Sequence, residues 1–181
     1  MKPVLKISLV AISVAVVSTR VMQAEAQTPF GAAENDAAIV ATLHAEGAQV
    51  YECRTDRGDK SSSEVRALSW QLREPIATLI VDGKSIGRHY AGPNWDYVDG
   101  SGVKGKVVAS AVGATSNDVP WLRLDVVDRR GSGVLSDATT VERINTKGGV
   151  AQGSCKVAGN FLSVPYSADY VFLRKTSDKS D

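Results

Sequence analysis

The stretch Ala77–Tyr90, ATLIVDGKSIGRHY, contains two runs of β-branched and aromatic residues on either side of Asp82-Gly83-Lys84. An Asp-Gly pair between two such runs is a strong hairpin signal, because both residues tolerate the positive φ angles of a two-residue turn. The stretch therefore predicts an antiparallel hairpin whose second strand ends at His89-Tyr90.

The same pattern continues on both sides of this hairpin. Runs of roughly five to eight residues recur at a spacing of roughly ten, and each ends in turn residues. This organisation predicts an all-β fold, an antiparallel sandwich or barrel of roughly 8–10 short strands in a single domain. Turns are predicted at Glu46-Gly47, at Arg73-Glu74-Pro75 and at Gly92-Pro93-Asn94. The alanine-rich run before Gly47 could also form a short helix, but its alternation favours strands.

The N-terminal residues indicate export. Lys2 and Lys6 precede an apolar run, and Ala24-Glu25-Ala26 follows it, a sequence typical of a cleaved signal peptide. A buried N-terminal helix is the alternative, although the run has almost no polar face. We therefore expect a secreted or periplasmic protein with no membrane span after cleavage. The predicted organisation is a signal peptide over 1–26, a loose leader over 27–36, one β domain over 37–175 and a flexible tail over 176–181.

Composition narrows the possible partners. Without residues 1–26 the chain carries nearly equal numbers of acidic and basic residues. Such a balance does not indicate the strongly basic face that nucleic acids require, so no nucleic-acid partner is expected.

Cys53 and Cys155 are the two cysteines of the chain. Two cysteines in an exported protein usually pair, and closing a loop of about 100 residues stabilises the fold by roughly 4 to 5 kcal/mol in the chain-entropy model. Two free thiols or a catalytic cysteine are the alternatives, but a cysteine nucleophile needs an adjacent base and histidines are scarce. We expect a disulfide.

The segment His89–Gly105, HYAGPNWDYVDGSGVKG, concentrates polar and aromatic residues in one turn-rich stretch. Aromatic rings beside polar groups are typical of sites for sugars and other small ligands. We therefore expect a non-catalytic binding or envelope module that takes a small polar or carbohydrate-like ligand, or a cell-surface partner. The candidate ligand-binding residues are His89, Tyr90, Trp95, Asp96 and Asp99.

Three chemical alternatives compete for this segment. A hydrolase-type enzyme would use His89 as a base beside Asp96 or Asp99. A metal site would need His44 to fold against His89, and the paired-histidine spacing of metal sites is missing, so no metal is predicted. Gly100–Gly105 matches GxGxxG, but a β pattern follows it where a dinucleotide site needs a helix, so no cofactor is predicted.

Several motifs occur together in one order: GAQVYEC at 47–53, HYAGPNW at 89–95, INTKGG at 144–149 and VPYSADYVF at 164–172. In this the chain resembles a family of exported bacterial and fungal proteins catalogued as a domain of unknown function, with the series GxQxYxC, HYAGPxW, NTxGG and PYxADYxF. The resemblance implies that Cys53 and Cys155 are family cysteines, and it supplies no catalytic residue. Some relatives carry a dehydrogenase name, which the export signal and the missing dinucleotide pattern argue against.

Overall fold

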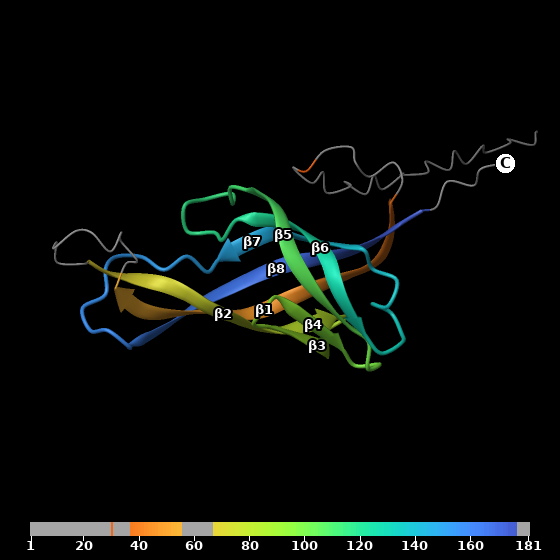
Figure 1. Cartoon of the computed structure of the whole chain (residues 1–181), viewed down its shortest axis with the longest axis horizontal. Helices are drawn as coiled ribbons and strands as arrows, with labels where there is room; N and C mark the ends of the chain where they lie inside the picture. Colours follow the sequence, from red (N-terminus) through yellow and green to blue (C-terminus); the bar gives the residue numbers. More distant parts are fainter. Residues whose placement is uncertain (1–29, 31–36, 56–66, 177–181) are drawn as a thin grey trace, which may run out of the picture.

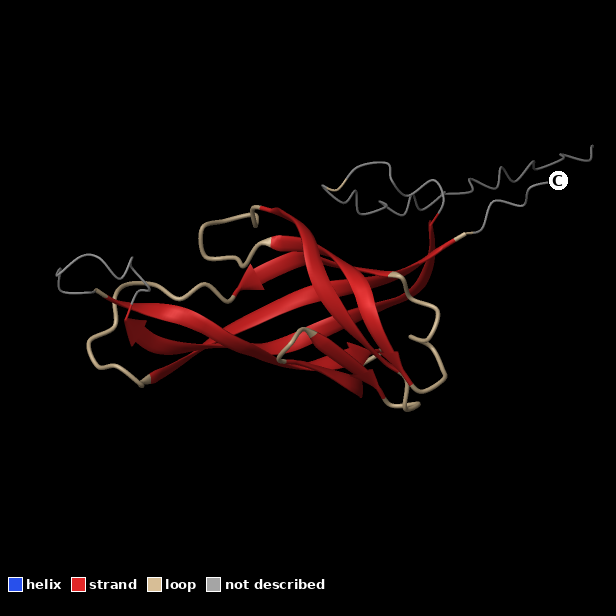
Figure 2. Cartoon of the chain, viewed as in Figure 1, coloured by secondary structure: helices blue, strands red, loops and turns tan. Residues whose placement is uncertain are grey.

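The computed structural model describes residues 30, 37–55 and 67–176, in which every regular element is a β-strand. Each strand pairs antiparallel with the next, and β8 pairs with β1, which closes a single barrel (Figure 1). Figure 2 shows the same all-strand architecture with its connecting loops. The predicted all-β class is confirmed, and of the two predicted architectures, sandwich and barrel, the structure has the barrel. The strands are β1 (Ala37–Thr55), β2 (Leu68–Val81), β3 (Lys84–Tyr90), β4 (Asn94–Tyr97), β5 (Gly102–Ala111), β6 (Trp121–Arg130), β7 (Thr140–Gly148) and β8 (Phe161–Lys175).

The hairpin predicted at Asp82-Gly83 is confirmed. β2 ends at Val81 and β3 begins at Lys84, and these two residues pair across the turn. Asp82 has φ 49° and Gly83 has φ 72°, the positive pair of a type I′ turn. This turn sets the register of the strand that carries His89.

The turn predicted at Glu46-Gly47 is wrong, because β1 runs through it as one strand of 19 residues. Gly47 is required there for a different reason. A Cβ atom at Gly47 would collide with the carbonyl oxygen of Ile76, so the glycine permits the close approach of β2.

The turn predicted at Arg73-Glu74-Pro75 is also wrong, because β2 continues for 14 residues. Val50 pairs with Glu74 and Tyr51 pairs with Leu72, so Arg73 is the extra residue of a β-bulge. The pairing of β2 with β3 begins only at Ala77, which leaves Pro75 on an edge where a missing N–H is tolerated. The predicted strands are therefore too short for β1, β2 and β8.

The barrel interior is filled by side chains from alternate positions of the strands. Its largest fully buried residues include Trp95, Tyr170, Phe172, Leu79 and Leu124. Each buried side chain of this size stabilises the fold by about 1.5 to 3 kcal/mol through removal of apolar surface from water. The same alternation places neighbouring residues of β3 and β4 on opposite faces of the wall.

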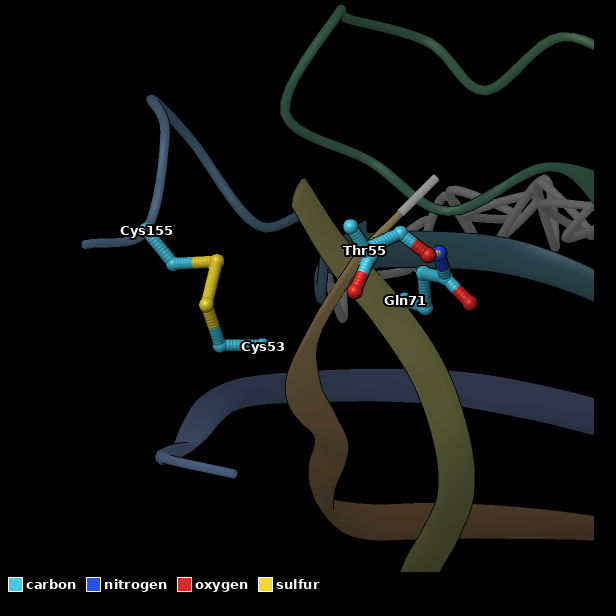
Figure 3. Close-up of a disulfide and its surroundings, with 4 residues drawn as sticks. All are labelled: Cys53, Thr55, Gln71 and Cys155. Carbon is cyan, nitrogen blue, oxygen red and sulfur yellow. Dashed lines mark hydrogen bonds between the residues drawn. A yellow bond between two sulfur atoms is a disulfide. The ribbon is translucent and has the colours of Figure 1, made fainter. Parts of the chain in front are cut away.

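The disulfide between Cys53 and Cys155 is confirmed, with Cα atoms 5.8 Å apart (Figure 3). It ties the segment between β7 and β8 to the end of β1. The backbone reinforces the tie, since Cys53 N–H donates to Asn160 O at 2.8 Å and Gly159 N–H donates to Cys53 O at 2.9 Å. Beside it, Gln71 Nε2 donates to Thr55 O at 3.3 Å, which joins the ends of β1 and β2.

The predicted signal peptide lies outside the described residues, as do the predicted leader apart from Phe30 and the last five residues of the chain. No helical segment with the length and apolar character of a membrane span occurs in the part of the chain that the structure describes.

Candidate ligand site

The segment His89–Gly105 spans the end of β3, a turn, β4, a loop and the start of β5. His89 pairs with Trp95, and Arg88 pairs with Asp96. Cross-strand partners point to the same face, so His89 and Trp95 lie together inside the barrel while Asp96 faces outward. The structure thus divides the five candidate residues between two faces and a loop.

On the inner face, the rings of His89 and Trp95 stack with centroids 4.6 Å apart and planes 11° apart. His89 Nδ1 lies 2.9 Å from Asn94 O. A carbonyl oxygen only accepts hydrogen bonds, so Nδ1 carries the proton. Burial lowers the pKa of His89 from 6.5 to about 4, and the nearby charge of Arg143 acts in the same direction. The imidazole is therefore neutral at pH 7.

On the outer face, Asp96 is held by two arginines. Arg88 donates from Nε and Nη2 to Asp96 Oδ2 at 3.0 and 2.8 Å, and Arg130 Nη2 donates to Oδ1. Tyr90 Oη also donates to Oδ1, at 3.3 Å, and the Arg88 guanidinium lies over the Tyr90 ring. Burial opposes ionisation of Asp96, but these hydrogen bonds outweigh it and hold the pKa of the carboxyl below its usual value.

Gly102 makes this arrangement possible. It pairs with Asp96 on one side and with Arg130 on the other. A Cβ atom at Gly102 would lie 2.9 Å from Arg130 Nη2 and 2.9 Å from Asp96 Oδ1. The second glycine of the GxGxxG match therefore leaves room for an ion pair across β5, and the strand that follows it confirms the predicted β pattern.

Asp99 braces the loop between β4 and β5. Its Oδ1 accepts hydrogen bonds from the Ser101 N–H at 2.8 Å and from Ser101 Oγ at 2.6 Å, and its Oδ2 accepts from the Val134 N–H at 2.7 Å. The hydrogen bonds from Ser101, followed by the one from Val134, hold the pKa of Asp99 below its usual value. Both oxygens of this carboxylate are thus engaged in joining two loops.

An open pocket of about 580 Å³ lies beside the outer ion pairs. Arg88 and Asp96 form one part of its lining, and Tyr97 and Val98 form another. Val98 is among the exposed apolar residues of the chain, so the pocket combines charge with apolar surface. This combination suits a ligand that has both polar groups and an apolar face.

The structure does not bring together the residues of the chemical alternatives. His89 bonds to a backbone carbonyl inside the barrel, whereas Asp96 and Asp99 are occupied elsewhere. His44 lies on the outside of β1, where its Nδ1 is 2.8 Å from Asp169 Oδ1. Within the described ranges, no three histidine, cysteine or carboxylate side chains gather as metal ligands would.

Sequence reasoning missed Arg88 and Arg130. The alternation of β3 could have identified Arg88, because it lies on the face opposite to His89. Arg130 carried no such signal, since only the pairing of β5 with β6 brings it to Asp96.

These features define an antiparallel eight-stranded barrel with a filled interior and an ion-paired outer face at β3, β4 and β5. The chain belongs to the family described as "Protein of unknown function (DUF3455)", which matches residues 33–174. The resemblance noted in the sequence implied a family of unknown function, and this membership is confirmed. The motif series of the family and its exported origin stay predictions. No curated protein and no solved structure matches the chain.

Proposed function

We propose that this protein is an exported, non-catalytic binding module that takes a small polar, carbohydrate-like ligand in the pocket beside Arg88 and Asp96. The observation that carries the proposal is the pocket of about 580 Å³ at the exposed pair of these two residues.

The chemistry of the lining favours a hydroxyl-rich ligand. The Arg88 side chain is 70 % exposed and keeps N–H groups available beyond those used on Asp96. Asp96 holds Arg88 in this orientation, because its Oδ2 accepts two hydrogen bonds from the Arg88 guanidinium while its Oδ1 is engaged by Arg130 and Tyr90. Val98 is exposed and supplies the apolar contact that the face of a sugar ring requires.

The candidate residues take different parts in this proposal. Asp96 and Tyr90 position Arg88, which contacts the ligand. His89 and Trp95 stabilise the wall behind them from inside the barrel. Asp99 holds the loop that borders the pocket. A hydrolase-type reaction is not proposed, because its histidine and carboxylates lie apart.

Calorimetric titration of the purified full chain with neutral and acidic mono- and disaccharides tests the proposal. We expect saturable binding by at least one sugar and about a tenfold loss of affinity in Arg88→Ala, which equals about 1.4 kcal/mol. Arg73→Ala is the matched control, since Arg73 is an exposed arginine of β2 that does not line the pocket. Absence of binding by every sugar, or equal losses in both variants, would overturn the proposal.

A further inference from the structure

A second open pocket lies on the opposite side of the barrel, where β7, β8 and β1 pair in that order. Its volume is about 520 Å³. Two of the motifs found in the sequence, at 144–149 and 164–172, meet here, and the pocket beside Arg88 uses neither of them. The lining comes from all three strands and consists of Glu46, Gly47, Lys147, Gly148, Pro165, Tyr166 and Ser167.

One row of cross-strand partners carries the two charged residues of this pocket. Lys147 of β7 pairs with Ser167 of β8, and Ser167 pairs with Glu46 of β1. Cross-strand partners point to the same face, and the exposure of Lys147 and Glu46 shows that this is the outer face. Neighbouring strands lie about 4.8 Å apart, so the backbones of Lys147 and Glu46 are about 10 Å apart, with Ser167 between them.

The two charges of this row do not neutralise each other. The Glu46 side chain is 66 % exposed, and its ionic contact is with His44, whose Nε2 lies 3.5 Å from Oε1. Within residues 37–55 and 67–176, no ion pair includes Lys147. The charge of Lys147 acts on Asp118, but both oxygens of that carboxylate already accept hydrogen bonds from other groups.

The backbone that carries Lys147 is held in place by its neighbours. The pairing of β7 with β8 shifts register just before Lys147, and such a bulge redirects the side chains of the strand. Thr146 is 3 % exposed, and its Oγ1 donates to Val119 O at 2.7 Å. Gly148 N–H donates to Asp118 Oδ1 at 2.6 Å. Lys147 therefore lies between two anchored residues.

The same bulge positions Glu46 through a chain of side-chain contacts. Asn145 Nδ2 donates to Asp169 Oδ2 at 2.9 Å, His44 Nδ1 lies 2.8 Å from Asp169 Oδ1, and His44 Nε2 faces Glu46. Asn145 has φ 51°, and among the described residues it is the one non-glycine residue inside a strand with a positive φ. An unfavourable backbone conformation persists where the surrounding structure enforces it, and such positions cluster at functional sites.

We propose that this pocket is a second ligand site, which binds a small zwitterion of the size of an α-amino acid or a dipeptide. The ammonium group of the ligand pairs with Glu46, and its carboxylate pairs with Lys147. Ser167 lies between the two and can donate or accept a hydrogen bond. Pro165 is exposed and offers apolar contact to the carbon atoms that join the two charged groups.

The separation of the two charges selects against other small ions. An anion that pairs with Lys147 is repelled by Glu46, and a cation that pairs with Glu46 is repelled by Lys147. A ligand that carries both charges gains both ion pairs.

Calorimetric titration of the purified full chain with L-leucine and with glycylglycine tests the site. Low ionic strength is used, because salt screens exposed charges. We expect saturable binding by at least one of these zwitterions. The N-acetyl form of the same compound lacks the ammonium group and its methyl ester lacks the carboxylate, so each should bind about fivefold more weakly.

Variants of the two charged residues locate the binding. Lys147→Gln and Glu46→Gln should each lower the affinity about fivefold, with unchanged unfolding midpoints, because both positions are exposed. Lys106→Gln, at an exposed lysine of β5, is the matched control and should bind as the unmodified chain does. Arg88→Ala should also keep the binding, which separates this site from the proposed sugar pocket.

Three results would overturn the proposal: no saturable binding by either zwitterion, equal affinity for a zwitterion and its singly charged forms, or unchanged affinity in either Lys147→Gln or Glu46→Gln. An equal loss in Lys106→Gln would also overturn it, because the effect would then follow the net charge of the protein and not the position of the lysine.

Discussion

The imidazole of His89 and the indole of Trp95 stack face to face inside the barrel, 4.6 Å apart. Both residues belong to a segment that looks, in sequence, like an exposed ligand loop. Their stacking and burial instead make them part of the packing that joins β3 to β4. Tyr170 completes the cluster, with its ring 4.9 Å from His89 and 5.3 Å from Trp95.

The burial of His89 predicts a loss of stability in acid. The pKa of His89 is about 4 in the folded state and 6.5 ordinarily, so the unfolded chain binds the proton more readily between these values. The contribution is fully present above pH 6.5 and is lost as the pH falls toward 4, by about 3 kcal/mol in total. Urea unfolding at a series of pH values measures it. His89→Phe keeps an aromatic ring without a titrating group, and an unchanged pH slope in this variant would contradict the prediction.

The space at Gly102 predicts that an added methyl group separates Asp96 from Arg130. Gly102→Ala should destabilise the barrel by about 1 to 3 kcal/mol, since the Cβ atom would also press on the backbone oxygen of Trp95. Lys104→Ala, at an exposed position on the same strand, is the control and should change stability by less than about 0.5 kcal/mol. Equal unfolding midpoints for the two variants in urea would refute the steric role.

The disulfide closes a long loop, since Cys53 and Cys155 are 102 residues apart in sequence. Replacing both cysteines with serine should lower the free energy of unfolding by about 4 kcal/mol in the chain-entropy model. Chemical denaturation with and without a reducing agent measures the effect. The reductant should destabilise the unmodified protein and leave the double variant unchanged; sensitivity of the double variant would show that the reductant acts elsewhere.

The turn between β2 and β3 predicts that substitutions at two adjacent positions change the stability of the fold in opposite directions. Asparagine adopts positive φ more readily than aspartate, so Asp82→Asn should stabilise the fold by about 0.5 kcal/mol. Gly83→Ala should destabilise it by about 1 kcal/mol, because the backbone of an alanine is strained at φ 72°. Thermal unfolding of both variants provides the comparison, and a shift of Tm in the same direction for both would argue against a type I′ turn in solution.

The sequence predicted the structure best where a feature depends only on residues that are neighbours along the chain. The Asp82-Gly83 hairpin and the end of β3 at Tyr90 depend on turn chemistry within a few residues. At Gly47 and at Pro75 the same rules failed, because a glycine or proline within a strand resembles a turn. Whether the strand continues is decided by the neighbouring strand, which the local sequence does not contain.

The sequence indicated which segment carries the candidate site, but it did not indicate which side chains meet there. The polar and aromatic density of His89–Gly105 led to the wall where β3, β4 and β5 meet. A one-residue step along a strand reverses the face, so His89 and Asp96 could not be assigned to one side without the register. Arg130 joins Asp96 only because β5 and β6 pair around Gly102.

For this protein the sequence alone determined the all-β class, the cysteine pair and the β2–β3 hairpin. Hydrophobic periodicity and turn residues act over a few neighbouring positions, and the pairing of two cysteines follows from their number. Barrel closure, the burial of His89 against Trp95 and the contact of Arg130 with Asp96 were decided only by the tertiary structure. Each depends on which distant strands become neighbours, and therefore on pairings that no short stretch of sequence specifies.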